Sequence, residues 1–185
     1  MLPRALVPIA DGSEELETVT IVNVLRRAGV EVTVAGVGAK QVRCSRGVQI
    51  VADCLIQECR GQDWDAIVLP GGMPGAEHLR DSTELVELLR AHVAAGKLYA
   101  AICASPAVVL HHHGLLRGRR ATCYPGFEQG MTGYQPAPVV VDGSCITANG
   151  PGSALRFALT VAAALVGREK AAAVARAMLA DDLAA

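Results

Sequence analysis

Hydrophobic runs and stretches of helical periodicity alternate along the chain. Short apolar or β-branched runs predict buried strands at residues 4–10, 30–37, 64–70 and 97–103. Apolar positions at helical spacing predict helices, which cover residues 11–29, 81–96, 105–114, 150–167 and 168–179. Two further stretches predict hairpins, residues 42–50 and residues 139–147 around an Asp-Gly turn. This alternation predicts one α/β domain over residues 1–185, a three-layer sandwich with a mainly parallel sheet.

The composition narrows the classes of function. The chain is 51% hydrophobic but only 3% aromatic, so Ala, Val and Leu must fill the core. Because 17 basic residues stand against 18 acidic ones, we expect no nucleic-acid-binding surface. No apolar stretch approaches the roughly 20 residues of a membrane span, and the first residues carry no signal-peptide pattern. We therefore expect a cytoplasmic protein with neither membrane nor nucleic-acid partners.

The cysteines and histidines do not form a familiar metal or disulfide pattern. The six cysteines contain no C-x-x-C pair, and a chain of this length needs no disulfides to fold. His111 to His113 are consecutive, but adjacent side chains at a helix end point in different directions, so we expect no metal. The glycines after residue 70 lack the G-x-G-x-x-G spacing, and Pro74 interrupts them. We expect no cofactor.

Cys103 stands where a predicted strand meets a predicted helix. Ligands of parallel sheets bind beyond the carboxyl ends of the strands, which is where this junction lies. The small residues Ala101, Ala104 and Ser105 flank Cys103, as a nucleophile elbow requires, with Ser105 as a candidate helix cap. A tight turn strains the backbone at the nucleophile, and the following helix N-terminus favours a thiolate. The other reading, an inert core cysteine, is the one we apply to the remaining five.

A glycine-rich loop follows the predicted strand at residues 64–70. Gly71 and Gly72 let backbone N–H groups turn inward, where they can join the N–H of Ala104. Together these groups predict an oxyanion or anion pocket next to Cys103.

Three glutamates crowd the start of the first predicted helix, and spacing separates them. Glu17 extends an apolar stripe, whereas Glu14 and Glu15 do not. The stripe comprises Glu17, Ile21, Val24, Leu25 and Ala28. Glu17 should therefore point into the domain. If Glu17 lies next to Cys103, two negative charges there would repel, so the pair should share one proton. Glu17 would then tune the ionisation of the thiol, and Cys103 would be the reactive residue.

The same helix carries a second stripe with no obvious partner inside the domain. It comprises Leu16, Val19, Thr20 and Asn23. A helix with two stripes predicts that one packs on the sheet and the other on a second subunit.

Several motifs occur in the order found in one protein family, and at nearly the same spacing, over essentially the whole chain. They are GSEELETVT, RRAGVEVTVAG, CSRGV, DAIVLPGG, AAICASPA, ANGPG and LVGREKAA. The chain resembles the ThiJ/PfpI superfamily, most closely the branch of the Parkinson-disease-associated protein deglycase and bacterial YajL. The resemblance implies a flavodoxin-like fold and a homodimer.

The resemblance also assigns roles to individual positions. Cys103 matches the oxidation-sensitive nucleophile, Glu17 its proton-sharing partner, and Gly72 and Ala104 the anion pocket. Positions near the family's dimer interface are Leu16, Arg27, Arg46 and Pro151. Two departures matter. Ala104 replaces the histidine of the protease-like branch, so we expect no peptidase activity. Tyr124 stands where the disease-associated protein has a histidine, so a pocket lined by Tyr124 and Ser105 lacks an imidazole base.

Two functions from different classes follow from these assignments. The first is a cofactor-free deglycase or glyoxalase, in which the Cys103 thiolate attacks small α-oxoaldehydes or their adducts on proteins, in defence against oxidative and carbonyl stress. The second is a redox-sensing chaperone, in which Cys103 is oxidised to a sulfinate without physiological catalysis. A third reading, a stable dimer whose turnover is a side reaction of its thiol, also stays open.

Overall fold

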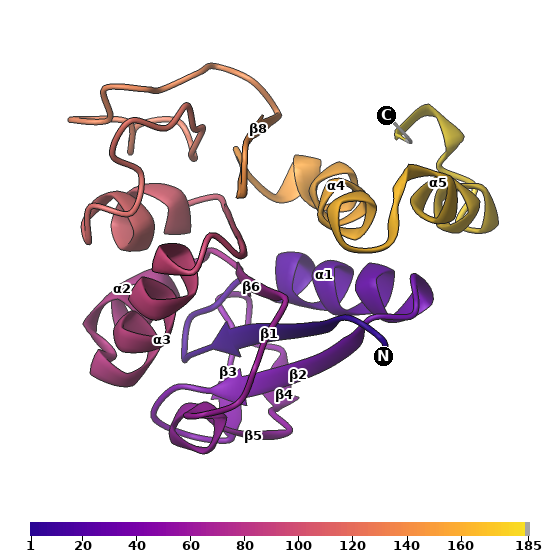
Figure 1. The fold of residues 1–185 in the computed structure, drawn as a ribbon. Coiled ribbons are helices and arrows are strands. Elements are labelled where there is room, and N and C mark those ends of the chain that lie inside the picture. The colour runs from indigo at the N-terminus through magenta and orange to yellow at the C-terminus, as the bar shows by residue number, and fades with distance from the viewer. Residues whose placement is uncertain (184–185) are drawn as a thin grey trace.

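A seven-stranded sheet forms the centre of the computed structural model, which describes residues 1–183 (Figure 1). The strand order is β5–β2–β1–β6–β7–β9–β8. Their bounds are β1 Arg4–Ile9, β2 Glu31–Gly36, β5 Cys54–Leu55, β6 Ala66–Leu69, β7 Leu98–Ile102, β8 Val139–Asp142 and β9 Cys145–Ala148. All neighbouring strands are parallel except β8 and β9, which form the expected antiparallel hairpin. The mainly parallel sheet is confirmed.

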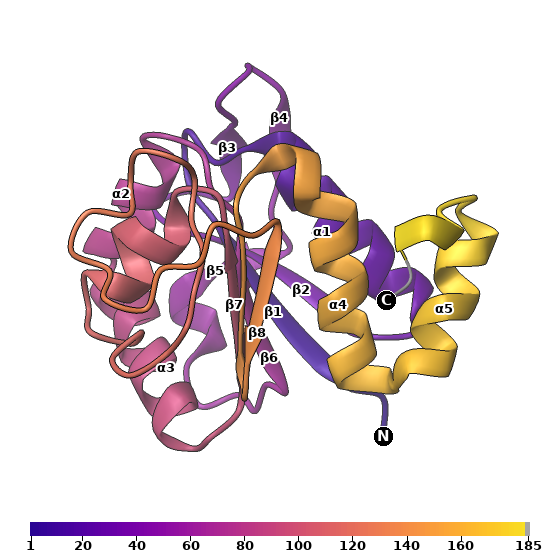
Figure 2. The ribbon, with the colours of Figure 1, turned by 90° about the horizontal axis from the view of Figure 1, so that it is seen from above.

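Helices cover both faces of this sheet (Figure 2). On one face, α1 (Glu15–Arg27) packs against α4 (Ala154–Val166), and α5 (Arg168–Ala177) packs against α4. The other face carries α2 (Gly75–Asp81), α3 (Thr83–Ala94) and a π-helix at Pro106–His111. Three short 3-10 helices lie at Ile56–Cys59, Pro151–Ser153 and Asp181–Leu183. These layers form the flavodoxin-like α/β sandwich that the sequence predicts.

A separate two-stranded ribbon extends beyond the main sheet. It pairs β3 (Gln41–Arg43) with β4 (Gln49–Val51) in the antiparallel register expected of the first hairpin. The hairpin turn is bound to α1, because the carboxylate of Glu15 accepts hydrogen bonds from the backbone N–H groups of Arg46 (3.1 Å) and Val48 (3.3 Å). The ribbon therefore has a fixed position beside the start of α1.

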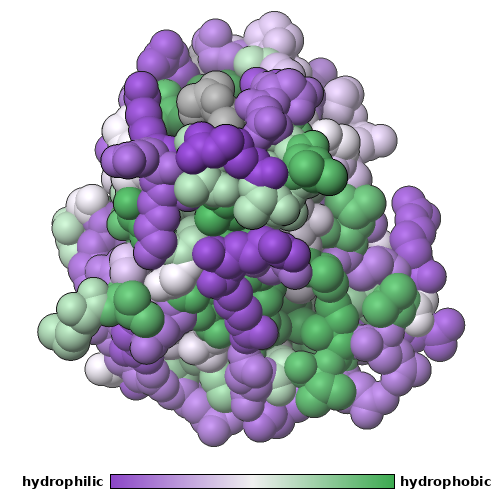
Figure 3. All heavy atoms as spheres, turned by 90° about the vertical axis from the view of Figure 1, so that its right-hand side faces the viewer, coloured by the Kyte–Doolittle hydropathy of each residue, from purple (hydrophilic) through white to green (hydrophobic). Residues whose placement is uncertain are grey.

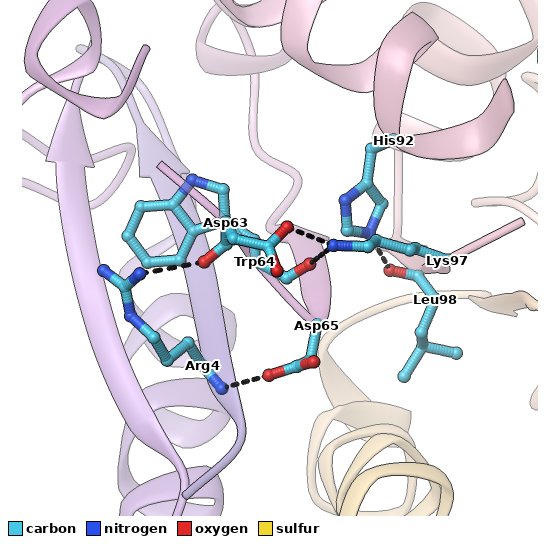
Figure 4. Close-up of polar contacts among 7 residues, drawn as sticks. All are labelled: Arg4, Asp63, Trp64, Asp65, His92, Lys97 and Leu98. Carbon is cyan, nitrogen blue, oxygen red and sulfur yellow. Dashed lines mark hydrogen bonds and ion pairs between the residues drawn. The ribbon is translucent and has the colours of Figure 1, made fainter. Parts of the chain in front are cut away.

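The amino ends of the central strands are joined by a polar network (Figure 4). Arg4 donates from its backbone N–H to Asp65 (2.8 Å) and from its guanidinium to the carbonyl of Asp63 (2.9 Å). The same guanidinium lies 4.5 Å from the ring centre of Trp64. Lys97 forms an ion pair with Asp63 and donates to the carbonyl of Trp64 at 2.9 Å. This network connects the strands at the end of the sheet opposite their carboxyl ends.

Hydrophobic and hydrophilic side chains both lie on the face with the amino ends of the strands (Figure 3). Figure 3 views this side, where the N-terminus and α5 lie, and hydrophobic side chains form a band between hydrophilic ones. Within residues 1–183, no helix is long and apolar enough to cross a membrane.

Candidate active site

Cys103 follows β7 directly and has the strained backbone expected of a nucleophile elbow. Its φ angle is +63°, in the left-handed region that side chains other than glycine rarely adopt. Two hydrogen bonds hold this conformation: Cys103 N donates to the carbonyl of Ala148 at 2.9 Å, and Tyr124 N donates to the carbonyl of Cys103 at 2.7 Å. The side chain is 9% exposed, so the thiol is enclosed but still reachable.

The backbone around the sulfur supplies two of the three predicted donors. The N–H groups of Gly72 and Ala104 face the sulfur and favour its thiolate, which opposes the rise in the pKa of the thiol that burial causes. Gly72 has φ +89°, and a Cβ there would lie 2.4 Å from Glu14 N, so only glycine fits. The N–H of Gly71 is not available to an anion, because it donates to Oε2 of Glu17 at 2.7 Å. The prediction that Gly71 lines the anion pocket as a donor is therefore wrong.

Glu17 is fully buried, as its place on the apolar stripe predicts. All five stripe positions, Glu17, Ile21, Val24, Leu25 and Ala28, have no exposed surface. Oε2 accepts the hydrogen bond from Gly71, whereas Oε1 is buried and has no partner within residues 1–183. Burial raises the pKa of Glu17 to about 7, so this carboxyl group takes up a proton near neutral pH. An unpartnered buried oxygen is the natural position for that proton.

The thiol and the carboxyl group influence each other. Burial, together with the negative charge of Glu17, raises the pKa of Cys103 to about 12. The N–H of Ala104, at the start of the following helix, favours a thiolate, but burial and the charge of Glu17 outweigh this contribution and that of the Gly72 N–H. The thiolate becomes accessible when Glu17 holds the proton, since the opposing charge is then removed. The site behaves as one acid shared between two groups.

Ser105 and Tyr124 lie next to Cys103, and Ser105 does not have the role predicted for it. Ser105 is fully buried and its hydroxyl donates to the carbonyl of Pro70 at 2.5 Å, so it neither caps the helix nor lines an open pocket. It joins the end of β6 to the turn after Cys103. Tyr124 is adjacent through its backbone, and its side chain is 45% exposed. The contact of Tyr124 with Cys103 that the structure shows is thus a backbone hydrogen bond.

Glu15 was not singled out by helical spacing, yet it has a defined role. It is buried and accepts from the hydroxyl of Ser45 as well as from the hairpin backbone. Although burial opposes ionisation, the hydrogen bonds from Arg46, Val48 and Ser45 lower the pKa of Glu15. The three glutamates therefore differ in role: Glu15 is a charged anchor, Glu17 binds a proton, and Glu14 accepts a hydrogen bond from the Ser45 hydroxyl at 2.6 Å. The crowding of carboxylates was the signal in the sequence, but their partners come from a distant hairpin.

Residues expected near a subunit interface are mostly on the surface. Leu16 and Val19 are about half exposed, at 51% and 53%, and Arg27 and Arg46 are also exposed. Pro151 is half-buried at the 3-10 helix before α4. The second stripe of α1 is thus uncovered in the single chain.

The three consecutive histidines lie away from Cys103. The rings of His112 and His113 meet edge to face at 4.8 Å, and His113 Nε2 lies 2.8 Å from the carbonyl of Arg80. Residues 1–183 contain no group of three or more His, Cys, Asp or Glu side chains that could bind a metal ion. The histidines line a cavity of about 610 Å³ with Arg90 and Arg117, and none of the residues described around Cys103 takes part.

Comparisons with known proteins show which family the chain resembles. The model of the DJ-1/PfpI family matches residues 3–164. Protein DJ-1 homolog B of Arabidopsis thaliana is 46% identical over 180 residues, which are 96% of this chain and 41% of that protein. The chain thus spans less than half the length of this plant relative. Glutathione-independent glyoxalase DJR-1.2 of Caenorhabditis elegans is 38% identical over 169 residues, 89% of each chain.

A solved structure shows the same fold. The structure titled Toxoplasma gondii DJ-1, oxidized, superposes with a TM-score of 0.93 and 47% sequence identity, covering 96% of this chain and 98% of that one. Family match, sequence identity and shared fold lead to one conclusion: the chain belongs to the DJ-1/PfpI family.

Proposed function

We propose that this protein is a cysteine-dependent, cofactor-free glyoxalase or deglycase that acts on methylglyoxal, glyoxal and their early adducts on proteins. The observation that carries the proposal is the arrangement of Cys103: a strained, enclosed thiol beside a buried carboxyl group with an unpartnered oxygen. Nucleophilic catalysis needs an activated thiol and a group to take its proton, and these two residues supply both.

The first step is attack by the Cys103 sulfur on the aldehyde carbon. The S–H bond breaks as Glu17 accepts the proton, a C–S bond forms, and the carbonyl electron pair moves to oxygen. The N–H groups of Gly72 and Ala104 adjoin the sulfur and stabilise the negative charge as it passes from sulfur to that oxygen. Return of the proton from Glu17 to that oxygen then gives a hemithioacetal on the enzyme. Because Cys103 provides the thiol, the reaction needs no external glutathione.

The Oε1 atom of Glu17, buried and unpartnered within residues 1–183, supports this residue as the group that moves the proton. Burial brings the pKa of Glu17 to about 7, where proton transfer is efficient. The relative named a glutathione-independent glyoxalase, of which 89% aligns with this chain, supports the substrate class.

The test is methylglyoxal consumption in the absence of glutathione. Cys103→Ser should abolish turnover, and Cys54→Ser, which changes a cysteine away from the site, should retain it. Undiminished turnover in Cys103→Ser would refute the proposal. The wild-type rate per thiol should also exceed that of free glutathione with the same aldehyde, since equal rates would indicate a side reaction of a reactive thiol.

A second function has its own supporting observation. Glu17 Oε1 is buried without a partner within residues 1–183, and a protonated Glu17 can donate to an oxygen of a Cys103 sulfinate. In this function, Cys103 senses oxidants and the sulfinate changes chaperone or partner binding. Mild peroxide should add two oxygen atoms to Cys103, and Glu17→Ala should weaken this product. Earlier oxidation of Cys44 or Cys145 would rule out the sensor function.

We further propose that two copies of the chain associate through the exposed stripe of α1. Leu16 and Val19 are half exposed on this helix, and Val51 on the neighbouring ribbon is 73% exposed. Apolar side chains in this number on adjoining elements are typical of a surface covered by another subunit.

A further inference from the structure

Cys54 and Cys59 face each other at the edge of the sheet. Cys54 begins the edge strand β5, and Cys59 ends the 3-10 helix that follows it. Their sulfur atoms lie 3.6 Å apart, in direct contact. All six cysteines are free thiols, and within residues 1–183 no such contact reaches the sulfur of Cys103. Nothing in the spacing of these two cysteines had indicated a pair.

The turn between the two cysteines is held by its own hydrogen bonds. Leu55 N donates to the carboxylate of Glu58 at 2.7 Å, and the Cys59 thiol lies 3.9 Å from the carbonyl of Leu55. Residue 54 is also fixed by the pairing of β5 with β2, opposite Ala35. The backbone therefore holds both thiols in one place before any reaction. To bond, the sulfurs need to approach only to about 2 Å, the length of a disulfide.

The two thiols differ in access to solvent. Cys59 is fully buried, and burial raises its pKa to about 12. Cys54 is only half-buried, at the outer edge of the sheet. An oxidant in solution therefore reaches Cys54 first, and Cys59 is placed to react with the product.

We propose that Cys54 and Cys59 form a second oxidation site, which a hydroperoxide converts reversibly into an intramolecular disulfide. In the first step, the Cys54 sulfur attacks the peroxide, the O–O bond breaks, and Cys54 becomes a sulfenic acid while an alcohol or water leaves. In the second step, the Cys59 thiol attacks the sulfenic sulfur, the S–S bond forms and water leaves. The two thiols lose two electrons and two protons, and the peroxide is reduced.

The same oxidant has a different outcome at Cys103. A sulfenic acid there has no second thiol in contact, so further oxidation to a sulfinate competes with reduction. At Cys54, Cys59 intercepts the sulfenic acid before a second peroxide arrives, because the two sulfurs are already in contact. The same chain thus contains two kinds of oxidation site: Cys103 gains oxygen and becomes a sulfinate, whereas Cys54 and Cys59 lose hydrogen and become a disulfide. This inference does not depend on Cys103 being catalytic.

The positions of basic residues make the two sites separable by mass spectrometry. Tryptic cleavage after Arg46 and Arg60 gives one peptide, residues 47–60, that contains both Cys54 and Cys59. Cleavage after Lys97 and Arg117 gives residues 98–117, which contain Cys103 alone. After treatment of the folded protein with hydrogen peroxide and blocking with iodoacetamide, residues 47–60 should lose two hydrogen atoms and carry no blocking group. Dithiothreitol should restore both alkylatable thiols.

Variants separate the paired reaction from general thiol oxidation. Cys59→Ser should abolish the hydrogen-loss product and leave Cys54 to gain oxygen or remain alkylatable. Cys44→Ser, which removes a buried thiol with no sulfur neighbour, should leave the disulfide yield unchanged. The proposal is wrong if wild-type residues 47–60 keep both alkylatable thiols at peroxide levels that oxidise Cys103. It is also wrong if the peptide loses hydrogen only through a bond between two chains. Methylglyoxal turnover, measured on the same samples, reports on Cys103 separately.

Discussion

Glu17 and Cys103 meet across the α-carbon of Gly71. A Cβ at Gly71 would lie 2.6 Å from the Cβ of Cys103 and 3.0 Å from Oε2 of Glu17. Helix α1 brings the carboxyl group and strand β7 brings the thiol, while the loop after β6 closes between them without a side chain. The coupling of the two acids follows from this close approach, which no other residue at position 71 would permit.

Gly71→Ala should therefore damage both the site and the fold. The new methyl group would also lie 2.9 Å from the carbonyl of Ile102, so backbone must shift. We expect a loss of about 1–3 kcal/mol in unfolding free energy and about a hundredfold in turnover. Gly152→Ala is the matched control, because a Cβ there has no neighbour within 4 Å. Thermal unfolding and methylglyoxal kinetics measure the two effects; equal behaviour of the two variants would contradict the geometry.

Glu17→Gln should make the thiol more acidic and the enzyme slower. Removing the carboxylate removes the charge that raises the pKa of Cys103, so iodoacetamide should react with Cys103 at lower pH. Glutamine cannot accept the thiol proton, and we expect turnover to fall about a hundredfold. Glu169→Gln, an exposed position on α5, is the control. A variant with both a more acidic thiol and full activity would exclude Glu17 as the proton acceptor.

The pH dependence of stability should reveal the same carboxyl group. Glu17 has a pKa of about 7 in the folded protein, above its ordinary value of 4.5, so the folded state binds more protons between these values. Its contribution therefore favours folding below pH 4.5 and is progressively lost as pH rises through 7. Glu17→Gln should remove this decline. If wild type and Glu17→Gln differ in unfolding free energy by the same amount at pH 5 and pH 8, Glu17 is not the buried acid.

The strained φ of Cys103 predicts an order of stabilities among variants without the thiol. Glycine adopts a φ of +63° without strain, whereas alanine does not. Cys103→Gly should therefore be more stable than Cys103→Ala, by about 1 kcal/mol. Chemical denaturation of the two variants measures the difference, and a more stable Cys103→Ala would show that the turn relaxes.

The uncovered stripe of α1 predicts an effect of charge on assembly. Val19→Asp places a carboxylate on the proposed contact, so the mass measured by light scattering should fall from two chains to one. Val141→Asp, at a similarly exposed valine on β8, should leave the mass unchanged. Dimers that persist in Val19→Asp would place the contact elsewhere.

The sequence was sufficient for the features that rest on local patterns. Apolar runs identified β1, β6 and β7, helical spacing selected Glu17, and small flanking residues located the elbow at Cys103. Helix α2 was not predicted, because seven residues make fewer than two full turns and follow a loop of glycine and proline. The role of Gly71 could not be predicted either, since its N–H could donate to a bound substrate oxyanion or to the carboxylate of Glu17. Only the packing of α1 against that loop decides between them.

Contacts between distant segments account for the remaining differences. Ser105 has the position of a helix cap, but the carbonyl of Pro70 lies in reach and takes its hydrogen bond. The sequence does not distinguish Glu15 from Glu14, because the hydrogen-bond donors to Glu15 come from the distant β3–β4 hairpin. The pair of Cys54 and Cys59 appears only when a 3-10 turn folds back on the sheet edge. In each case the sequence identifies a residue that can form the contact, but it does not identify the partner that the fold brings to that residue.

The left-handed backbone at Cys103 also has an evolutionary consequence. Glycine adopts a φ of +63° without strain and cysteine does not, so the backbone at position 103 alone would favour replacement of the cysteine by glycine. Lineages that no longer need the thiol should replace it with glycine more often than with alanine, because glycine relieves the backbone strain. Retention of cysteine there is then a record of selection for sulfur chemistry rather than for the fold.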